Sequence, residues 1–452
     1  MKRLFWPAAH LPGWISSAPR DAKLTIAGAL MPTNPISLWD GTAEEDAVEG
    51  SLPEGRHFDV VAVGGGFTGL STALHCAAKG LSCHVLEAQT VGFGGSGRNV
   101  GLVNAGVWLP PQEVSGVVGA RKGAQLVDTL GKMPGYVFDL IERHQIRCEA
   151  RQTGSIHVAH SPKGFENLRH RAEGWKALGA PVDLLSAAEV AERTGTRAFH
   201  GGLLDHRAGT INPMGYVRGL ARAALGAGAT ISTGVKVIGL ERDGDRWRVL
   251  TEKGEITGTS VVLGTNAYTD ELWPGLKDTF TTIEYFQVAT QPLTGRLDGI
   301  LEEVRGIWDT AQVMTSLRRD AHDRLIIGSM GAVMGGKSGL SGRWAAKQMA
   351  RLFPDLGPVD FEEAWHGQIA MTPDHIFRIH RLAEGLYTPI AYNGRGITTG
   401  TMFGRALAEI LTGADPDTLP VALTDVKPVP GRALKIGFYR AAFAATQMWR
   451  SL

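Results

Sequence analysis

The sequence predicts an α/β fold that contains a Rossmann-like nucleotide-binding domain, and three observations lead to this prediction. The 452 residues are enough for about one to three domains, and 43% hydrophobic with 20% charged residues is an ordinary globular composition. Glycine is unusually frequent, and its 59 residues gather in short clusters, which is typical where the backbone approaches a ligand closely. One of these clusters lies inside a βαβ unit.

That unit begins with an apolar, β-branched run at 58–63, which predicts a buried parallel strand. Apolar residues at helical spacing over 70–77 predict a helix that ends near Gly80, and a second strand follows at 83–86. Between the first strand and the helix, residues 64–69 read Gly-Gly-Gly-Phe-Thr-Gly, a GxGxxG motif. A strand, a glycine turn and a helix in this order are typical of a dinucleotide-binding site.

Each glycine of the motif has a physical role in such a site. Gly64 makes the tight turn, Gly66 lets a pyrophosphate approach the backbone, and Gly69 allows close helix packing. The helix N-terminus presents free N–H groups and partial positive charge to the phosphates. Glu87 lies where an acid accepts hydrogen bonds from the adenosine ribose, and its charge disfavours a 2′-phosphate, so NADP is the poorest candidate. NAD and FAD both remain compatible with these residues.

Two further glycine-rich segments follow the same logic. Residues 91–101 contain five glycines, too many for the interior of a helix or strand, and Ser96 and Arg98 there can supply hydrogen bonds and charge to a wrapped ligand. Residues 393–400 open a late helix that runs to about Leu411. The N–H groups at that helix start can stabilise negative charge on a bound ring system.

Charge and cysteine content exclude several classes of protein. Lys plus Arg is 46 and Asp plus Glu is 45, a balance that argues against a nucleic-acid partner. The three cysteines, Cys76, Cys83 and Cys148, are too sparse for a disulfide framework or a metal site and favour a cytoplasmic location. No apolar run of about 18 residues predicts a transmembrane helix. The first 30 residues lack a signal-peptide pattern, and Met31 is an alternative start.

Period-2 alternation and turn residues predict additional short strands. These lie at 154–159, 235–241, 246–251, 261–263, 281–293, 324–329 and 386–392. Residues 431–452 form a predicted amphipathic helix. Docking of this helix on the body of the protein is the preferred interpretation, and a membrane-surface anchor is the alternative.

With these motifs in place, the chain resembles the FAD-dependent amine and amino-acid oxidoreductases of the D-amino-acid oxidase family. Within that family it is most similar to the gamma-glutamylputrescine oxidase branch, over roughly Ser37 to Gly413. The resemblance is carried by residues 63–70, 92–101, 202–205 with Gly209 and Asn212-Pro213, 264–268, 285–293 and 393–400.

The resemblance implies a two-domain flavoprotein. Residues 58–150, 204–280 and 366–430 would form the FAD-binding domain, and 151–203 with 281–365 a substrate domain whose antiparallel sheet roofs the substrate cavity. An N-terminal arm (1–57) and a C-terminal helix (431–452) complete the chain. The expected FAD contacts are Gly64, Gly66, Phe67, Thr68, Gly69, Glu87, Ala88, Gly95, Ser96, Gly97, Arg98, Asn99, Val237, Thr265, Asn266, Gly394, Arg395, Gly396, Ile397 and Thr398.

The resemblance also implies noncovalent FAD. Relatives that attach flavin covalently use a Cys shortly before a Thr-x-Asp stretch or a His in the loop after the acid. Here the first position is Gly367, and the loop 92–101 has no His. Arg395 stands where the branch often has His, and Val100 replaces a more usual small residue.

The implied reaction is oxidation of the C–N bond of a small amine or amino acid by hydride transfer to flavin N5, followed by imine hydrolysis, with oxygen or another acceptor re-oxidising the flavin. Arg395, Tyr285, Gln287 and Arg318 are the candidate catalytic or substrate-contacting residues, and Trp365 is a candidate apolar wall. Histidines such as His157 are expected to be structural, because no metal-ligand spacing is present. The alternatives are an NAD-dependent Rossmann dehydrogenase and a non-catalytic FAD-binding subunit of a hetero-oligomer. The sequence predicts neither the substrate's identity nor the oligomeric state.

Overall fold

The computed structural model describes residues 37–304 and 306–451. The chain divides into two units between residues 34 and 35, and the described residues all belong to the second. The alternative start at Met31, the signal-peptide question and most of the predicted N-terminal arm lie outside the described residues. The second unit carries the fold and the candidate site.

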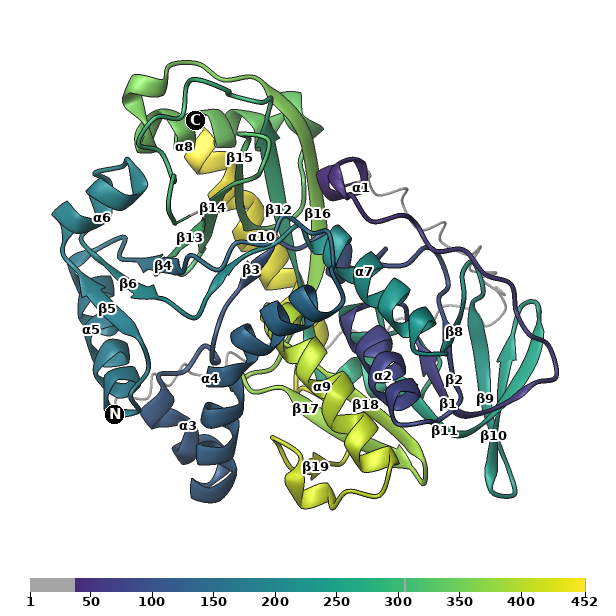
Figure 1. Ribbon diagram of the computed structural model, residues 1–452. Coiled ribbons are helices and arrows are strands. Elements are labelled where there is room, and N and C mark those ends of the chain that lie inside the picture. Colours follow the sequence, from purple (N-terminus) through teal and green to yellow (C-terminus); the bar gives the residue numbers. More distant parts are fainter. Residues whose placement is uncertain (1–36, 305, 452) are drawn as a thin grey trace, which may run out of the picture. The chain divides into compact units, whose positions relative to one another are not determined.

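The first sheet has nine strands and contains the predicted βαβ unit (Figure 1). Its order is β19-β17-β18-β11-β1-β2-β8, and the hairpin β9–β10 pairs with β11. The pairs β8–β2, β2–β1, β1–β11 and β11–β18 are parallel. The bounds are β1 His57–Val63, β2 Cys83–Leu86, β8 Thr230–Ser232, β9 Val237–Asp243, β10 Arg246–Thr251, β11 Gly254–Leu263, β17 Arg378–Ala383, β18 Leu386–Ile390 and β19 Leu423–Thr424.

The central strand β1 is buried on both faces, which explains its continuous apolar sequence. Val60 and Ala62 belong to one apolar cluster together with helix α2 (Phe67–Ala78). Val61 and Val63 belong to a second cluster, which includes the hairpin β9–β10. Parallel strands covered on both faces read as uninterrupted apolar runs because neither face is exposed to water.

Four helices complete this half of the unit. They are α2, α4 (Ala120–Arg143), α7 (Pro213–Gly226) and α9 (Gly396–Leu411). Helix α2 packs between α7 and α9, and α4 packs against α9. The N-termini of α2 and α9 therefore lie beside each other, although their sequences are more than 300 residues apart.

The second sheet has eight strands in the order β16-β12-β15-β14-β13-β4-β6-β5. Every neighbouring pair is antiparallel except β13–β4, which is parallel. The bounds are β4 Ser155–Val158, β5 Val182–Leu185, β6 Gly202–Asp205, β12 Thr281–Thr290, β13 Gly306–Asp309, β14 Thr315–Arg319, β15 Leu325–Met330 and β16 Phe361–Met371. The antiparallel sheet implied by the resemblance is thus present with one parallel step.

Two of the expected domain limits fall inside strands of this second sheet. The limit between 203 and 204 divides β6, which pairs over its whole length with β4 and β5. The limit between 365 and 366 divides β16, which pairs with β12 as far as Met371. Both strands pair with strands of the second sheet on either side of the expected limit, so we assign them whole to that sheet.

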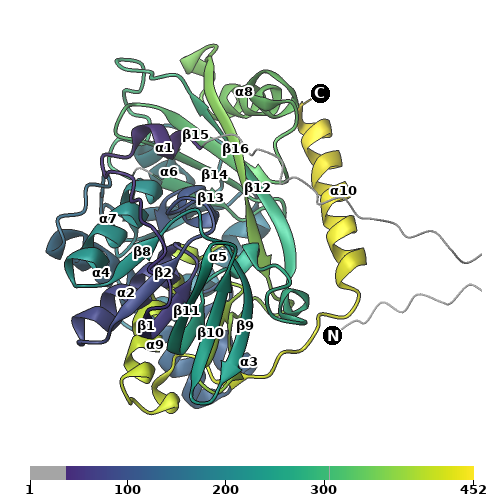
Figure 2. The ribbon, with the colours of Figure 1, turned by 90° about the vertical axis from the view of Figure 1, so that its right-hand side faces the viewer.

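The remaining elements connect the two sheets or cover them. The predicted C-terminal helix is α10 (Arg432–Ser451), and it packs against α8 (Leu340–Leu352) and β12 (Figure 2). None of the helices within 37–304 and 306–451 has the length and apolarity needed to cross a membrane. Other bounds are α1 Leu38–Thr42, α3 Pro111–Val118, α5 Pro162–Ala177, α6 Ala187–Thr194, β3 Leu102–Val103 and β7 Gly209–Thr210.

Candidate functional site

The GxGxxG turn leaves no room for side chains where the backbone folds back. Gly64 follows β1 with φ 106°, a conformation that favours glycine. A Cβ on Gly69 would lie 2.0 Å from the carbonyl oxygen of Gly64, so α2 begins in direct contact with the turn. A Cβ on Gly66 would lie 2.8 Å from Ser96 Oγ. The turn is therefore a backbone surface at the start of α2, where the first N–H groups of a helix lack partners within the helix.

Glu87 lies at the end of β2, next to this turn. The Gly65 N–H donates to Oε2 at 2.6 Å and the Gln89 N–H donates to Oε1 at 2.8 Å. Burial raises the pKa of Glu87, and the hydrogen bonds from backbone N–H groups act in the opposite direction. The carboxylate is thus held at the carboxyl edge of two parallel strands, the edge at which open α/β sheets bind nucleotides.

The glycine-rich loop 92–101 is fixed to the start of α2. Ser96 Oγ accepts a hydrogen bond from the Phe67 N–H at 3.0 Å. Asn99 folds the loop onto itself, because its Nδ2 donates to the carbonyls of Gly95 (3.0 Å) and Ser96 (2.8 Å). The expected cofactor-contacting residues of this loop are therefore ordered beside the N-terminus of α2.

The same loop is supported from the second sheet. The carbonyl of Arg98 accepts hydrogen bonds from Gln287 Nε2 at 2.6 Å and from Trp365 Nε1 at 3.0 Å. Arg98 Nε donates to the carbonyl of Phe93 at 2.7 Å. Gln287 and Trp365 are both fully buried. Two residues expected to face a substrate thus support the loop from beneath.

Arg318 also holds the loop segment. Its NH1 donates to the carbonyls of Val100 (3.0 Å) and Ile211 (2.6 Å), and its guanidinium lies 4.9 Å from the ring of Trp39. Trp39, in α1, donates from Nε1 to the carbonyl of Asn99 at 2.9 Å. Sequence analysis missed Trp39, because the arm at 1–57 has no recognisable pattern and holds two further tryptophans, Trp6 and Trp14.

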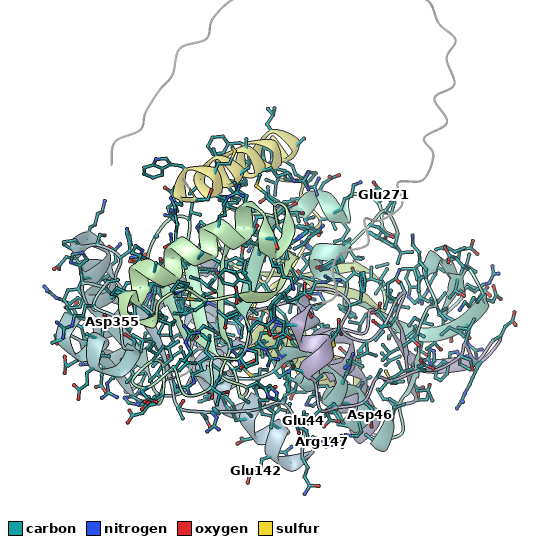
Figure 3. All side chains as sticks on the ribbon, turned by 90° about the horizontal axis from the view of Figure 1, so that it is seen from above. Glu44, Asp46, Glu142, Arg147, Glu271 and Asp355 are labelled. Carbon is teal, nitrogen blue, oxygen red and sulfur yellow. The ribbon has the colours of Figure 1, made fainter. Side chains whose placement is uncertain are left out.

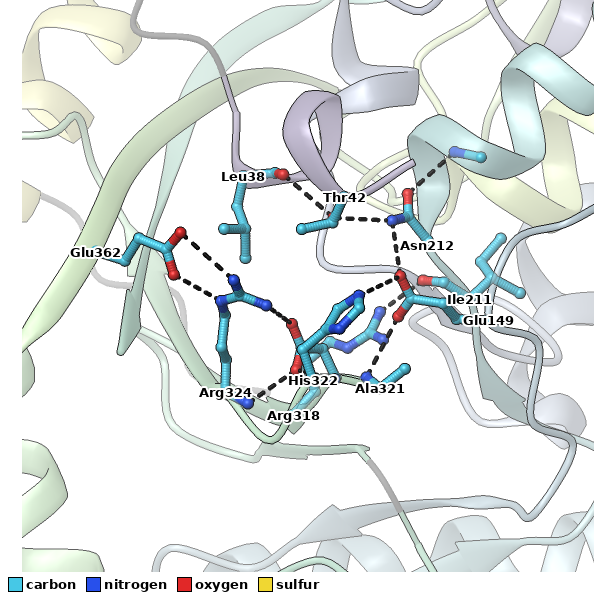
Figure 4. A network of polar contacts seen from close by, with 12 residues as sticks. Leu38, Thr42, Glu149, Ile211, Asn212, Arg318, Ala321, His322, Arg324 and Glu362 are labelled. Atoms are coloured by element: carbon cyan, nitrogen blue, oxygen red, sulfur yellow. Dashed lines mark hydrogen bonds and ion pairs between the residues drawn. The ribbon is translucent and has the colours of Figure 1, made fainter. Parts of the chain in front are cut away.

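A polar network joins α1, α7 and the second sheet beneath Arg318 (Figure 4). Asn212 Oδ1 accepts from the Gly215 N–H at 3.0 Å and caps α7. Its Nδ2 donates to Thr42 Oγ1 (3.0 Å) and Glu149 Oε1 (3.1 Å). Glu149 in turn faces His322 Nε2 at 4.0 Å. Asn212, one of the residues that carries the family resemblance, thus ties three elements together.

The late glycine turn brings a second helix start to the site. Asn393 and Gly394 have φ of 52° and 81°, and α9 begins at Gly396. Helix α9 packs on α2 through Gly400 and Gly404, where a Cβ would lie 3.2 Å from Phe67 Cβ and 2.4 Å from Ser71 Cβ. This Gly-x-x-x-Gly spacing was visible in the sequence and was not used. Two adjacent helix N-termini concentrate partial positive charge in one place.

The segment 264–268 lies between β1 and the late turn. The Gly264 N–H donates to the carbonyl of Val63 at 2.8 Å. Asn266 Oδ1 accepts from the Ala391 N–H at 2.8 Å. Val237, the first residue of β9, is buried in the same apolar cluster as Val63. The expected cofactor contacts at Thr265 and Asn266 therefore adjoin the same strand end as Gly64, and Val237 shares an apolar cluster with that strand.

Arg395, expected to face the substrate, lies in an aromatic cluster. Its NH1 donates to the carbonyl of Ala105 at 3.1 Å. Its guanidinium lies 4.9 Å from the ring centre of Trp308 and 5.3 Å from that of Trp108. Burial lowers the pKa of Arg395 to about 9, and the positive charge of Arg171 contributes in the same direction. Arg395 thus pays a desolvation penalty beside another cation.

Arg171 and His157 complete this cluster. Arg171 NH1 donates to the carbonyls of Val107 (3.2 Å) and Leu109 (3.1 Å), and burial lowers its pKa to about 10. His157 stacks on Trp308 at 3.4 Å between ring centres, and burial lowers its pKa well below the usual range, so it is neutral at pH 7. Within 37–304 and 306–451, neither Arg171 nor Arg395 forms an ion pair with a carboxylate. Sequence analysis did not select Trp108, Trp308 or Arg171, because nothing in the local sequence distinguishes them.

Tyr285 has a different environment. Its hydroxyl donates to Ser316 Oγ at 2.7 Å inside the second sheet, and burial raises its pKa. Of the four candidate catalytic residues, Arg395 alone belongs to the aromatic cluster, and the other three bind groups of the second sheet or the loop.

Thr398 is an expected cofactor contact at the start of α9. It donates from Oγ1 to the carbonyl of Asn104 at 3.2 Å.

A glycine turn with an adjacent acid, a second glycine loop and two converging helix N-termini are typical of a dinucleotide-binding protein. The family model described as FAD dependent oxidoreductase matches residues 59–410, and the chain belongs to this family. FAD, rather than NAD, is therefore the cofactor. The residues present fit it, because glycines form the surface on which the pyrophosphate would lie.

Comparisons with individual proteins agree with this assignment. The chain is 30% identical to "Gamma-glutamylputrescine oxidoreductase" of Escherichia coli (strain K12), over 89% of this chain and 95% of that protein. It is 28% identical to "Probable oxidoreductase OrdL" of Rhizobium meliloti (strain 1021), over 88% and 94%. The crystal structure of glycine oxidase from Geobacillus kaustophilus matches with a TM-score of 0.68 and 21% identity, over 82% of this chain and 99% of that one. The last comparison establishes the fold.

Proposed function

We propose that this enzyme oxidises the C–N bond of a small amine or amino acid, with FAD bound noncovalently between the starts of α2 and α9. The observation that carries the proposal is the convergence of these two helix N-termini on one side of loop 92–101. When bound, FAD supplies the hydride acceptor at N5. The names of the relatives, an oxidoreductase of gamma-glutamylputrescine and a glycine oxidase, support an amine or amino acid as the substrate class.

The chain's own residues bind and orient the cofactor in this proposal. The backbone of the GxGxxG turn and of loop 92–101 would hold the pyrophosphate, and Glu87 would accept hydrogen bonds from the ribose hydroxyls. The start of α9 would lie near the ring system, and its partial positive charge would favour the negative charge of a reduced flavin. A Cβ at Gly367 would lie 3.2 Å from Arg98 Cβ. Glycine has no side-chain sulfur that could form a covalent link to the flavin.

Arg395 binds an anionic or polar group of the substrate, and Trp108 with Trp308 form the wall beside it. A buried guanidinium without a carboxylate partner gains a bidentate hydrogen-bonding partner when a carboxylate enters. Arg171 adds positive charge and fixes the backbone at 107–109. Gln287, Arg318 and Trp365 are positioning residues in this scheme, since they hold loop carbonyls.

The substrate carbon would lose one proton and two electrons together as hydride, for which bound FAD would be the acceptor. The amine proton would pass to solvent, and water would hydrolyse the imine to a carbonyl compound and an amine or ammonia. A neutral amine is required, and the positive charge of Arg395 and Arg171 disfavours an ammonium nearby. Oxygen or another acceptor closes the cycle. We place this activity in the cytoplasm, because Cys76, Cys83 and Cys148 are all free and buried.

An anaerobic reduction experiment tests the proposal. Purified protein is expected to be yellow, with flavin absorbance near about 450 nm. Matched pairs of primary amines with and without a carboxylate, together with N-methyl amino acids and gamma-glutamyl amines, are then mixed with it in the absence of other proteins. Bleaching by one class of amine identifies the substrate class. Within a pair, the member that carries a carboxylate is expected to reduce the flavin faster. Failure of every amine to bleach the flavin would favour the non-catalytic subunit instead.

A further inference from the structure

The outer face of α10 exposes large apolar side chains to solvent. Leu434 is 82% exposed, Phe438 68%, Met448 45% and Trp449 77%. Four of the eight exposed large apolar residues in the described part of the chain therefore lie on this one helix. With the exposed Ala441 and Ala445 they follow one face of the helix, and we call these six residues the α10 outer stripe.

The opposite face of α10 fixes the helix in this orientation. Phe443 and Gln447 are buried, and Gln447 Nε2 donates to Ser341 Oγ of α8 at 2.8 Å. Arg440 NH2 forms an ion pair with Glu284 of β12 at 2.9 Å. Turning the helix to hide the stripe would break these contacts. The stripe therefore faces outward because the inner face is already bound to the protein.

All charged side chains of α8 and α10 are positive. Helix α10 carries Arg432, Lys435, Arg440 and Arg450, and it has no Asp or Glu. Helix α8, which packs against it (Figure 3), carries exposed Arg343, Lys347 and Arg351 one turn apart, and it also has no Asp or Glu. Asp278 and Glu284 pair with Arg432 and Arg440. The other cations form no ion pair among the described residues, and Asp309 is the acid whose charge acts on Arg351 and Arg450. The whole chain has a formal charge of only +1, so this concentration of positive charge is local.

We propose that the α10 outer stripe, flanked by the cations of α8 and α10, docks the enzyme on an anionic membrane surface. An apolar helix face with Trp, Phe and Leu, bordered by basic residues, inserts into the headgroup region, while Lys and Arg contact anionic lipids. A second copy of the chain would instead bring the same cations of both copies together across a two-fold axis. Charge complementarity therefore selects the lipid surface as the occupant. This inference is independent of the substrate proposed above.

Vesicle co-sedimentation of the full-length, flavin-loaded protein tests the inference. Vesicles of phosphatidylcholine containing about one third phosphatidylglycerol are expected to bind the protein at least about tenfold more strongly than pure phosphatidylcholine. Binding is expected to weaken several-fold when salt rises from about 0.1 M to 0.5 M. The double variant Phe438→Ser/Trp449→Ser is expected to lose about tenfold or more of the binding, because both aromatic anchors are removed.

The matched control is Leu178→Ser/Ile238→Ser, which removes two apolar residues of similar exposure (60% and 56%) outside α10. This control is expected to bind vesicles like the unaltered protein. Both variants are expected to retain flavin and amine-dependent bleaching in solution, which separates the outcome from that of the proposed reaction. The inference is overturned if the unaltered protein ignores anionic vesicles, if both double variants bind equally well, or if the stripe variant lowers the molecular mass in solution without changing lipid binding. Binding that appears only after deletion of residues 1–36 would also overturn it, because the chain's own N-terminus would then occupy the stripe.

Discussion

The glycine-rich stretch from Gly64 to Asn99 and the aromatic cluster around Arg395 are built in different ways. In the glycine-rich stretch, backbone groups form the surface expected to bind the nucleotide, and its positions follow one another along the chain. In the aromatic cluster, side chains make the surface, and Arg395 binds the carbonyl of a residue 290 positions away. A cofactor shared by a whole family can be bound by backbone groups, whereas a particular substrate requires side chains brought together from distant segments.

The largest expected effect comes from blocking the backbone surface. Gly66→Leu places a side chain where a Cβ alone would lie 2.8 Å from Ser96 Oγ, in the path of the pyrophosphate. We expect colourless protein that unfolds cooperatively, as measured by absorbance and circular dichroism. Gly226→Ala is the control, because a Cβ there meets nothing within 4 Å. Retention of flavin by Gly66→Leu would show that the pyrophosphate binds elsewhere.

Changing the side-chain region should separate chemistry from cofactor binding. Arg395→Ala is expected to keep FAD but to slow flavin reduction by an anionic substrate about 100-fold or more, because the loss of a buried charged hydrogen bond costs several kcal/mol. Arg395→Lys should recover only part of the rate, since an ammonium cannot form the planar bidentate contact. Stopped-flow reduction under anaerobic conditions measures both. Equal rates in all three proteins would remove Arg395 from the substrate site.

Acid should destabilise the folded protein through His84 in β2. His84 is buried between Thr230 Oγ1 (2.7 Å) and Ser232 Oγ (2.9 Å), and burial lowers its pKa from 6.5 to about 4. Below pH 6.5 the unfolded chain takes up a proton that the folded chain does not. The free energy of unfolding should therefore fall between pH 6.5 and pH 4, by up to about 3 kcal/mol. Denaturant titrations measure this slope, and His84→Gln should flatten it; an unchanged slope would assign the acid sensitivity to other groups.

The smallest expected effect concerns Gln287, which connects the two regions. Gln287→Leu removes one of two donors to the carbonyl of Arg98 and leaves Trp365 Nε1 in place. We expect FAD to bind about three- to tenfold more weakly, with the substrate KM unchanged. Trp365→Phe should act similarly, and the double variant should lose more than the sum of the two because the carbonyl then loses both of these donors. A change in KM with unaltered FAD affinity would instead place Gln287 against the substrate.

Local patterns predicted much of the fold because their causes are local. The strand at 58–63, the helix after Gly69, the hairpin around residue 244 and the C-terminal helix all lie where periodicity and turn residues placed them. The limits at 203/204 and 365/366 fell inside β6 and β16. Those limits depend on which distant strand each segment pairs with, and a single strand's sequence does not specify its partner.

The sequence by itself determined the βαβ unit, the glycine positions and the family, since a positive φ or a close backbone approach leaves glycine as the residue that fits. Only the tertiary structure decided that Gln287 and Arg318 support a loop, that Trp39 secures it, and that Trp108, Trp308 and Arg171 surround Arg395. The residue type at a single position can show which backbone conformation is needed there. The environment of a side chain depends on residues hundreds of positions away, so packing alone assigns its role.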